Sequence, residues 1–414
     1  MTTATGLAEV TIDSIAAGGD GVGRADGRVV FVPRAAPGDV ARVRLQEKGR
    51  FARGEIVELV HASADRVDPP CPHYTEDRCG GCQLQHLAYD AQLAAKGRII
   101  VETLARIGRR TVTLGGVRAS ARPWRYRRKL TLAMRWRRES GWIAGLHPYD
   151  DPDAVFALGD CPITDERVVN IWKAILAQSR LFPRVPRLRG AVRLLDEGAS
   201  FVLEGGRQWR EGEALLAAVP ELRAVWWAPD DSRPRLVAQR DERATAGASF
   251  AQVNVAVGEE LHDHVVARVG AYAPASVIDA YSGTGDTAVR FAQSGARVTA
   301  IELDREAAEF AASRLTAPSR SVRGRVEEHI GNALPADVVV INPPRSGIDA
   351  RVAAALQDAD PAPRALIYVS CDPATLARDL TRMPRYRVAS AVAFDMFPQT
   401  AHVETVCELV PEAA

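Results

Sequence analysis

The stretch Val277-Ile278-Asp279-Ala280-Tyr281-Ser282-Gly283-Thr284-Gly285 is a short apolar run that ends in a glycine-rich turn. Residues 287–293 then have helical character, 297–302 form a second apolar run, and 305–315 have helical character again. The chain keeps this alternation of strand and helix from about Ala244 onward. Such regular alternation predicts a largely parallel sheet with helices on both faces. We therefore expect an α/β fold for the C-terminal part.

The glycine-rich turn is the expected cofactor site, with Gly283, Gly285 and Asp286 as candidate residues. Glycine suits this position because the backbone must turn tightly and let a ligand approach without a Cβ. Glu302 follows Gly285 by seventeen residues, at the tip of the second run, where a carboxylate can hold the two hydroxyls of a ribose. The spacing Gly283-x-Gly285-x-x-Ala288 also satisfies the dinucleotide fingerprint, so an NAD-dependent oxidoreductase is one alternative.

The residues around this turn favour S-adenosylmethionine (SAM) as the cofactor. Asp279 lies in the strand before the glycines, Glu302 follows the next strand, and Asn342-Pro343-Pro344-Arg345 follows a later one. This set is typical of Rossmann-like methyltransferases, whereas a dehydrogenase has no obvious use for the proline pair. The tripeptide Asn-Pro-Pro also resembles the site of enzymes that methylate exocyclic nitrogens. An amino-group methyltransferase, which needs no cysteine nucleophile, is a second alternative.

A cysteine follows another predicted strand, 366–370, at Cys371. In an open α/β sheet, ligands bind outside the carboxyl ends of the strands, so a thiol at a strand tip is a candidate nucleophile. The alternative is a small buried side chain without chemistry. Glu404, before the final strand, supplies a carboxylate that can act as a general base. We expect Cys371, Glu404 and the Asn342–Arg345 loop to converge at one end of the sheet.

The chain has 414 residues, 47% of them hydrophobic, which is enough for roughly two to three domains. Its formal net charge is only +1, yet residues 96–142 hold twelve arginines and two lysines against Glu102 and Glu139. Within this segment, 125–138 alternates charged with apolar and aromatic side chains. The pattern predicts a strand with one face in a core and the other facing RNA. A solvated edge strand with protective charges is the alternative. The candidate RNA contacts are Arg125, Arg127 and Lys129.

The N-terminal part, from Ala8 to about His61, alternates apolar and polar residues, and Asp26-Gly27 is a good hairpin turn. This pattern predicts a small all-β barrel, which suits oligonucleotide binding. Its eight basic and eight acidic residues up to Val60 balance, so charge adds little to that interpretation. Farther along, 88–107 predicts an amphipathic helix, whose apolar stripe is Leu93, Ile99, Ile100, Leu104 and Ile107.

Four cysteines form a pattern suited to one metal centre, namely Cys71, Cys79, Cys82 and the distant Cys161. Zinc is possible on spacing alone. The N-terminus shows no basic flank followed by an apolar core, and no apolar run approaches the length of a membrane span. We therefore expect a cytoplasmic protein whose six cysteines are reduced thiols or metal ligands.

Together these features resemble the RNA uracil-C5 methyltransferase family, in particular its cluster-containing members that act on 23S ribosomal RNA. The resemblance spans nearly the whole chain. It rests on five motifs: Cys71-Pro-His-Tyr, Cys79-Gly-Gly-Cys-Gln-Leu-Gln-His86, Phe250-Ala-Gln-Val-Asn254, Ser370-Cys-Asp-Pro373 and His402-Val-Glu-Thr-Val406. It implies a TRAM or OB-like barrel over 1–62, a central α+β iron-sulfur domain over 63–243 and a Rossmann-like methyltransferase domain over 244–414.

The resemblance also implies roles for individual residues. The four cysteines would hold a 4Fe-4S cluster, Cys371 would be the nucleophile and Glu404 the base. The methyl donor would be lined by Gln252, Tyr281, Glu302 and Asn342. This sequence departs from the family twice, because aspartate is usual at the position of Asn342 and asparagine is frequent at that of Asp286. The two departures move one negative charge within the expected donor pocket.

The chemistry supports these roles independently, because C5 of uracil is a poor nucleophile until a thiolate adds to C6. Arg345 is the candidate for activating that thiol. The target nucleotide must be flipped or already unpaired. The expected partner is RNA, with 23S ribosomal RNA favoured and transfer RNA as the alternative, and we expect a monomer with no membrane contact. A non-catalytic RNA-binding protein is the last alternative, against which Cys371 and Glu404 argue.

Overall fold

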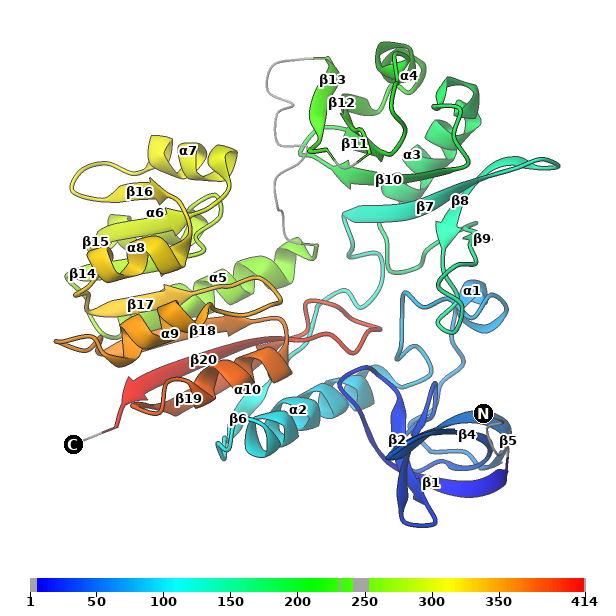
Figure 1. Ribbon diagram of the computed structural model, residues 1–414, viewed down its shortest axis with the longest axis horizontal. Helices are drawn as coiled ribbons and strands as arrows, with labels where there is room; N and C mark the ends of the chain where they lie inside the picture. The colour runs from blue at the N-terminus through cyan, green and yellow to red at the C-terminus, as the bar shows by residue number, and fades with distance from the viewer. Residues whose placement is uncertain (1–5, 231, 241–252, 413–414) are drawn as a thin grey trace.

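A computed structural model describes residues 6–230, 232–240 and 253–412 of the chain. It contains a closed five-stranded barrel, a seven-stranded sheet and an eight-stranded sheet. The barrel and the seven-stranded sheet lie on one side of the molecule, and the eight-stranded sheet lies on the other (Figure 1). Within the described residues, no helix has the length and apolar character needed to span a bilayer.

The N-terminal barrel has the strand order β1-β2-β3-β5-β4. Alternate apolar side chains, among them Val10, Val30 and Val43, are fully buried inside it. The predicted hairpin at Asp26-Gly27 is confirmed, because both residues have positive φ and join β2 to β3. The barrel strands are β1 (Leu7–Ile15), β2 (Gly21–Ala25), β3 (Arg28–Val32), β4 (Val40–Lys48) and β5 (Phe51–His61).

The helix predicted over 88–107 is present as α2 (Tyr89–Arg106), after the short α1 (Pro72–Thr75). Its predicted apolar stripe was wrong in part. Ile107 is 39% exposed, whereas Gln92 and Lys96 are buried on the inner face of the helix. The charge of Lys96 is tolerated there because its ammonium pairs with the carboxylate of Asp395, and both side chains are fully buried.

The seven-stranded sheet has the order β13-β12-β11-β10-β7-β8-β9. Residues 129–137 of the basic stretch form β7, whose Leu130, Leu132 and Met134 are buried, whereas residues 125–128 precede the strand. Because β7 lies between β10 and β8, the edge-strand alternative is wrong. The elements of this region are β7 (Lys129–Arg137), β8 (Gly141–Leu146), β9 (Phe156–Ala157), α3 (Glu166–Ala177), η1 (Ser179–Leu181), β10 (Arg187–Leu194), β11 (Ala199–Glu204), α4 (Gly212–Ala218), β12 (Leu222–Ala228) and β13 (Arg235–Gln239).

The eight-stranded sheet has the order β16-β15-β14-β17-β18-β20-β19-β6, and its first five strands are parallel. The strands and helices predicted between 277 and 315 are confirmed. The strands are β14 (Ser276–Ala280), β15 (Arg297–Glu302), β16 (Arg320–Arg323), β17 (Val338–Ile341), β18 (Ala365–Ser370), β19 (Tyr386–Phe394) and β20 (Glu404–Pro411). The helices are α5 (Val255–Gly270), α6 (Asp286–Gln293), α7 (Arg305–Arg314), α8 (Val326–Ala333), α9 (Ala350–Gln357) and α10 (Pro373–Thr381).

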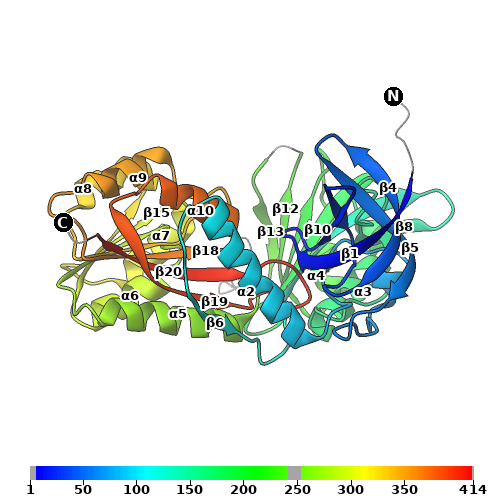
Figure 2. The same cartoon turned by 90° about the horizontal axis from the view of Figure 1, so that it is seen from below.

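Two elements from the range 63–243 belong to the layers of this C-terminal sheet. The strand β6 (Leu114–Arg118) pairs in parallel with β19 at the edge of the sheet. Ile100 and Leu104 of α2 pack in the same core as residues of β14, β17 and β18. Figure 2 shows α2 beside this sheet, pointing toward the half of the molecule that contains the barrel. The helix thus connects the C-terminal sheet with the cysteine-containing segment before it.

Candidate functional site

The predicted site residues of the C-terminal domain follow the carboxyl ends of its parallel strands. Tyr281 follows β14, Glu302 ends β15, Asn342 follows β17 and Cys371 follows β18. These strands are neighbours in the sheet, so the four positions lie along one edge. Ligands of open α/β sheets bind at this edge.

The glycine-rich turn is shaped by backbone conformation and by Glu302. Gly283 and Gly285 have φ values of 55° and 80°, and Tyr281, with φ of 62°, shares the left-handed region. The amide of Gly283 donates to the Glu302 carboxylate at 2.8 Å, and that of Asp304 donates to its other oxygen at 2.7 Å. A Cβ on Gly285 would lie 2.8 Å from Cβ of Ala311, whereas one on Gly283 would meet nothing within 4 Å. Gly285 is therefore needed for helix packing, and Gly283 leaves open space for a ligand.

Two aspartates near this turn differ in their electrostatic surroundings. Asp279 is buried and accepts a hydrogen bond from the Thr287 hydroxyl at 2.7 Å, and burial raises its pKa to about 7. Asp286 forms an ion pair with Arg314 at 2.5 Å, and despite partial burial its pKa is lowered by this pair and by Thr284. The extra negative charge expected at Asp286 is therefore neutralised locally.

The remaining residues predicted to line the methyl-donor site make fewer contacts. Asn342 is exposed, and its backbone amide donates to the carbonyl of Ala280 at 3.2 Å. Gln252 lies outside the described residues. Asn254, from the same sequence motif, is the N-cap of α5 and donates from its side-chain amide to the Ser120 hydroxyl at 3.0 Å.

Cys371 and Glu404 lie next to each other across two antiparallel strands. The register of β18 with β20 pairs Ser370 with Thr405, so the next step along both strands brings Cys371 opposite Glu404. Side chains that face each other in this way have Cβ atoms about 4.5–5.5 Å apart. The structure therefore brings the predicted nucleophile and the predicted base together at the sheet edge.

The electrostatics of this pair depend on burial and on Arg345. Burial raises the pKa of Glu404 to about 7, with the guanidinium of Arg345 acting in the opposite direction. Burial, and then the charge of Glu404, raise the pKa of the Cys371 thiol, and Arg345 again opposes the shift. Because each negative charge disfavours the other, the carboxylate and the thiolate are coupled titrating groups.

His402 lies near Arg345, and the sequence motif contained it without marking it as functional. It precedes Glu404 by two residues, and its ring lies 6.0 Å from that of Phe397. Partial burial and the nearby Arg345 lower its pKa. The available signal was its position, since residues i and i+2 of an extended chain point to the same side.

The four predicted metal-ligating cysteines come together although Cys161 is distant in sequence. All four are buried, and Cys71, Cys82 and Cys161 belong to one core cluster. Burial and the charges of Cys161 and Cys71 raise the pKa of Cys79 to about 11, while the amide of Gly81 opposes the shift. In the part of the chain that the structure describes, no three or more His, Cys, Asp or Glu side chains are arranged to hold a metal ion.

The three predicted RNA contacts in the basic stretch differ in their surroundings. Arg125 forms an ion pair with Asp160 at 2.7 Å and donates to the carbonyl of Cys161 at 3.1 Å, so it holds the cysteine loop. Arg127 donates to the carbonyl of Lys129 at 3.1 Å. Lys129 points away from the core of the sheet, and burial and then the nearby Arg193 lower its pKa.

Comparison with known proteins identifies relatives over 97% of the chain. Residues 324–410 match the family described as tRNA (Uracil-5-)-methyltransferase, and residues 8–57 match the TRAM domain. An uncharacterized RNA methyltransferase from Thermosynechococcus vestitus is 32% identical and covers 97% of this chain and 97% of its own. Another from Halalkalibacterium halodurans is 29% identical and covers 97% and 96%.

A solved structure shows the same fold. The tRNA (uracil-54, C5)-methyltransferase of Pyrococcus abyssi, in complex with S-adenosyl-L-homocysteine, superimposes with a TM-score of 0.69 over 97% of this chain and 99% of that one, at 23% identity. The family match over residues 324–410 and the 32% identical RNA methyltransferase set aside the NAD-dependent oxidoreductase and the non-catalytic protein. The chain belongs to the RNA uracil-C5 methyltransferase family and is a SAM-dependent RNA methyltransferase with an N-terminal TRAM domain.

Proposed function

We propose that this protein methylates C5 of a uracil in 23S ribosomal RNA through a covalent bond between Cys371 and C6 of the base. The observation that carries the proposal is the register of β18 with β20, which brings Cys371 opposite Glu404. This pair lies at the same edge of the sheet as the glycine-rich turn that follows β14. Enzymes that methylate exocyclic nitrogens need neither a thiol nor a base in this arrangement. Transfer RNA is the alternative substrate for the same mechanism.

The proposed reaction uses each of these two side chains once. The Cys371 thiolate adds to C6, and the electron pair of the C5–C6 bond forms an enolate that makes C5 nucleophilic. C5 then takes the sulfonium methyl of SAM, which leaves as S-adenosylhomocysteine. Glu404 removes the proton from C5, the C6–S bond breaks, and the thiolate is regenerated. Arg345, whose charge lowers the pKa of both groups, favours the ionised forms that the first and last steps need.

The experiment that tests this proposal is covalent trapping with RNA that contains 5-fluorouracil. Fluorine at C5 cannot leave as a proton, so the adduct should persist through denaturing electrophoresis. We expect a slower band that depends on SAM and forms with 23S ribosomal RNA. A band with transfer RNA alone would support the alternative substrate, and no band with either RNA would contradict the mechanism.

For the methyl donor, we propose that Tyr281, Gly283, Gly285, Asp286, Glu302, Asn342 and Gln252 line its site. Glu302 is already held by the amides of Gly283 and Asp304, so it can accept ribose hydroxyls without moving. The pairing of Asp286 with Arg314 argues that this departure from the family leaves donor binding largely unaffected. We also propose that the protein acts as a monomer in the cytoplasm.

For the cysteines, we propose that Cys71, Cys79, Cys82 and Cys161 hold a 4Fe-4S cluster in a central α+β domain. The donor set fits in kind, because all four cysteines are buried and four cysteine thiolates are the usual ligands of such a cluster. The cluster would tie the segment around Cys71 to the loop around Cys161. We expect anaerobically purified protein to contain equal amounts of iron and acid-labile sulfide, and Cys161→Ser to lose both. Stoichiometric zinc without sulfide would contradict the cluster.

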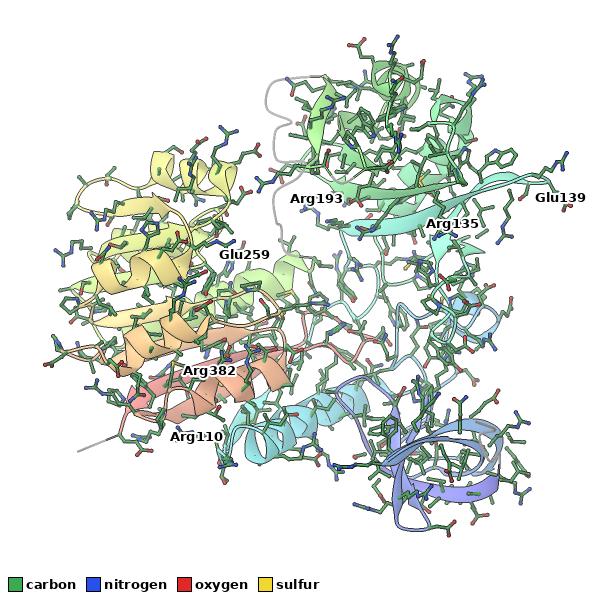
Figure 3. The ribbon with its side chains drawn as sticks, viewed as in Figure 1. Arg110, Arg135, Glu139, Arg193, Glu259 and Arg382 are labelled. Carbon is green, nitrogen blue, oxygen red and sulfur yellow. The ribbon has the colours of Figure 1, made fainter. Side chains whose placement is uncertain are left out.

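RNA docking involves, we propose, the basic sheet face, defined as Lys129, Arg135, Arg187 and Arg189. The register pairs Arg135 directly with Arg187, and both point away from the core that buries Leu130, Leu132 and Met134. Arg135 and Arg193 lie on these neighbouring strands in Figure 3. Burial and the charge of Arg187 lower the pKa of Arg135. Directly opposed like charges destabilise a sheet, and a polyanion relieves this cost.

We expect Arg187→Gln to weaken RNA binding and to lower the slope of log affinity against log salt by roughly one unit. The reason is the loss of one phosphate contact with its released counterion. Arg167→Gln is the matched control, because Arg167 lies on α3 and pairs with Asp165 at 2.8 Å. Filter binding across a salt series checks both variants. Equal slopes for Arg187→Gln and the unaltered protein would contradict docking at this face.

A further inference from the structure

The loop between β19 and β20, residues 395–403, carries His402 and ends at Glu404. Most of its bonds to other segments are made with residues 83–126. The Lys96 ammonium pairs with Asp395 and donates to the carbonyl of Phe397 at 3.1 Å. The Tyr126 hydroxyl donates to the carbonyl of Pro398 at 3.0 Å. The position of this loop is therefore set largely from outside the C-terminal sheet.

Gln399 is the residue on which these bonds converge. It is 2% exposed and has φ of 70°, a conformation that a residue with a side chain rarely adopts. Its backbone amide donates to the side chain of Gln92 at 3.0 Å, and the Gln92 amide donates back to the Gln399 side chain at 2.9 Å. Surrounding contacts must hold this conformation, because it is costly when left unsupported.

The other side of Gln399 is held by the segment that follows Cys82. Its carbonyl accepts from the backbone amides of Gln83 at 3.1 Å and Leu84 at 3.0 Å. The side chain of Gln83 also accepts from the amide of Ala401 at 3.4 Å, and its own amide donates to Gly80 at 2.8 Å. The cysteine-containing segment thus contacts the loop three residues before Glu404.

We propose that Gln399 is a positioning residue for Glu404, anchored by Gln92 on α2 and by the backbone of Gln83 and Leu84. This inference rests on the proposed function. The bonds around Gln399 fix where β20 begins, and this in turn fixes the carboxylate relative to Cys371. A base must lie within hydrogen-bond reach of the proton that it removes. Loss of the anchor therefore slows proton removal from C5 more than it slows addition of the thiolate.

The test compares two full-length variants with one control. Gln399→Gly keeps the backbone bonds, since glycine accepts a positive φ, and removes only the side chain. Gln92→Leu removes both bonds of the reciprocal pair and leaves the Gln399 amide without that acceptor. The control Gln357→Ala loses a comparable bond, from the Arg385 amide at 3.0 Å, on a part of the domain away from the loop. Thermal unfolding is measured for each protein.

On RNA with ordinary uracil, we expect Gln92→Leu to accumulate the covalent adduct and to turn over about tenfold or more slowly, and Gln399→Gly to show a smaller change in the same direction. Adduct formation on 5-fluorouracil RNA should stay within about twofold of the unaltered protein, because it needs no proton removal. The control should behave as the unaltered protein.

Turnover of both variants at the unaltered rate would overturn the inference. Loss of the 5-fluorouracil adduct in variants that still unfold cooperatively would also overturn the inference. The hydrogen bonds around Gln399 would then support the whole site and not Glu404 in particular. Absence of that adduct in the unaltered protein would instead overturn the proposed function, so the two failures are distinguishable.

Discussion

Replacement of Cys371 by alanine is expected to abolish the SAM-dependent adduct with 5-fluorouracil RNA. Methylation should fall by several orders of magnitude, on the order of 10⁴ or more, as when other covalent nucleophiles are removed. The physical reason is that C5 stays unreactive until a thiolate adds to C6. The measurements are denaturing electrophoresis for the adduct and methyl incorporation for turnover.

The matched control for this substitution is Cys407→Ala. Cys407 lies on β20 opposite Tyr368, is fully buried, and has a pKa that burial raises to about 12. It is a core residue, and its loss should leave the adduct intact. If Cys371→Ala kept methylation, the amino-group methyltransferase would become the better interpretation, because that chemistry acts directly on an exocyclic nitrogen.

Local patterns predicted the elements of the C-terminal domain and their strand ends correctly. The glycine-rich turn, the acid at the end of β15 and the cysteine after β18 each depend on neighbours within a few residues. Such positions are visible in a sequence because strand ends of a parallel sheet meet at one edge. The placement of Cys371 opposite Glu404 was expected only as convergence at one end of the sheet. Its register follows from the insertion of β20 between β18 and β19, which no local pattern encodes.

The features that the sequence did not predict involve charge pairs between distant segments. Lys96 occupies the buried face of α2, and only its partner Asp395, nearly three hundred residues later, makes that position favourable. Asp286 looked like an added charge in the donor site until Arg314 was found beside it. Sequence patterns place lysine on the solvent-facing side of a helix. The ion pair that allows Lys96 to be buried is therefore visible only in the folded structure.

Replacement of Glu404 by glutamine is expected to stop the reaction after methyl transfer. The amide keeps the size of the side chain but cannot take the C5 proton, so the methylated adduct should accumulate on ordinary RNA. Turnover should fall by roughly 10²–10⁴, the usual contribution of a general base. Cys371→Ala should form no adduct, whereas Glu404→Gln should form an adduct that persists. One denaturing gel therefore distinguishes the nucleophile from the base.

The pH dependence provides a second test of Glu404, because its pKa is raised to about 7. Only the carboxylate can accept the proton, so the rate of adduct breakdown should rise about tenfold per unit below pH 7 and level off above it. Adduct formed at about pH 6 and then shifted to higher pH isolates this step from titration of the Cys371 thiol. Glu408→Gln is the matched control, since Glu408 lies on the same strand but pairs with Arg268 at 2.7 Å, which keeps its pKa low. If the rate of adduct breakdown did not depend on pH, proton removal would have to be assigned to another group. The same conclusion would follow if Glu408→Gln changed this pH dependence.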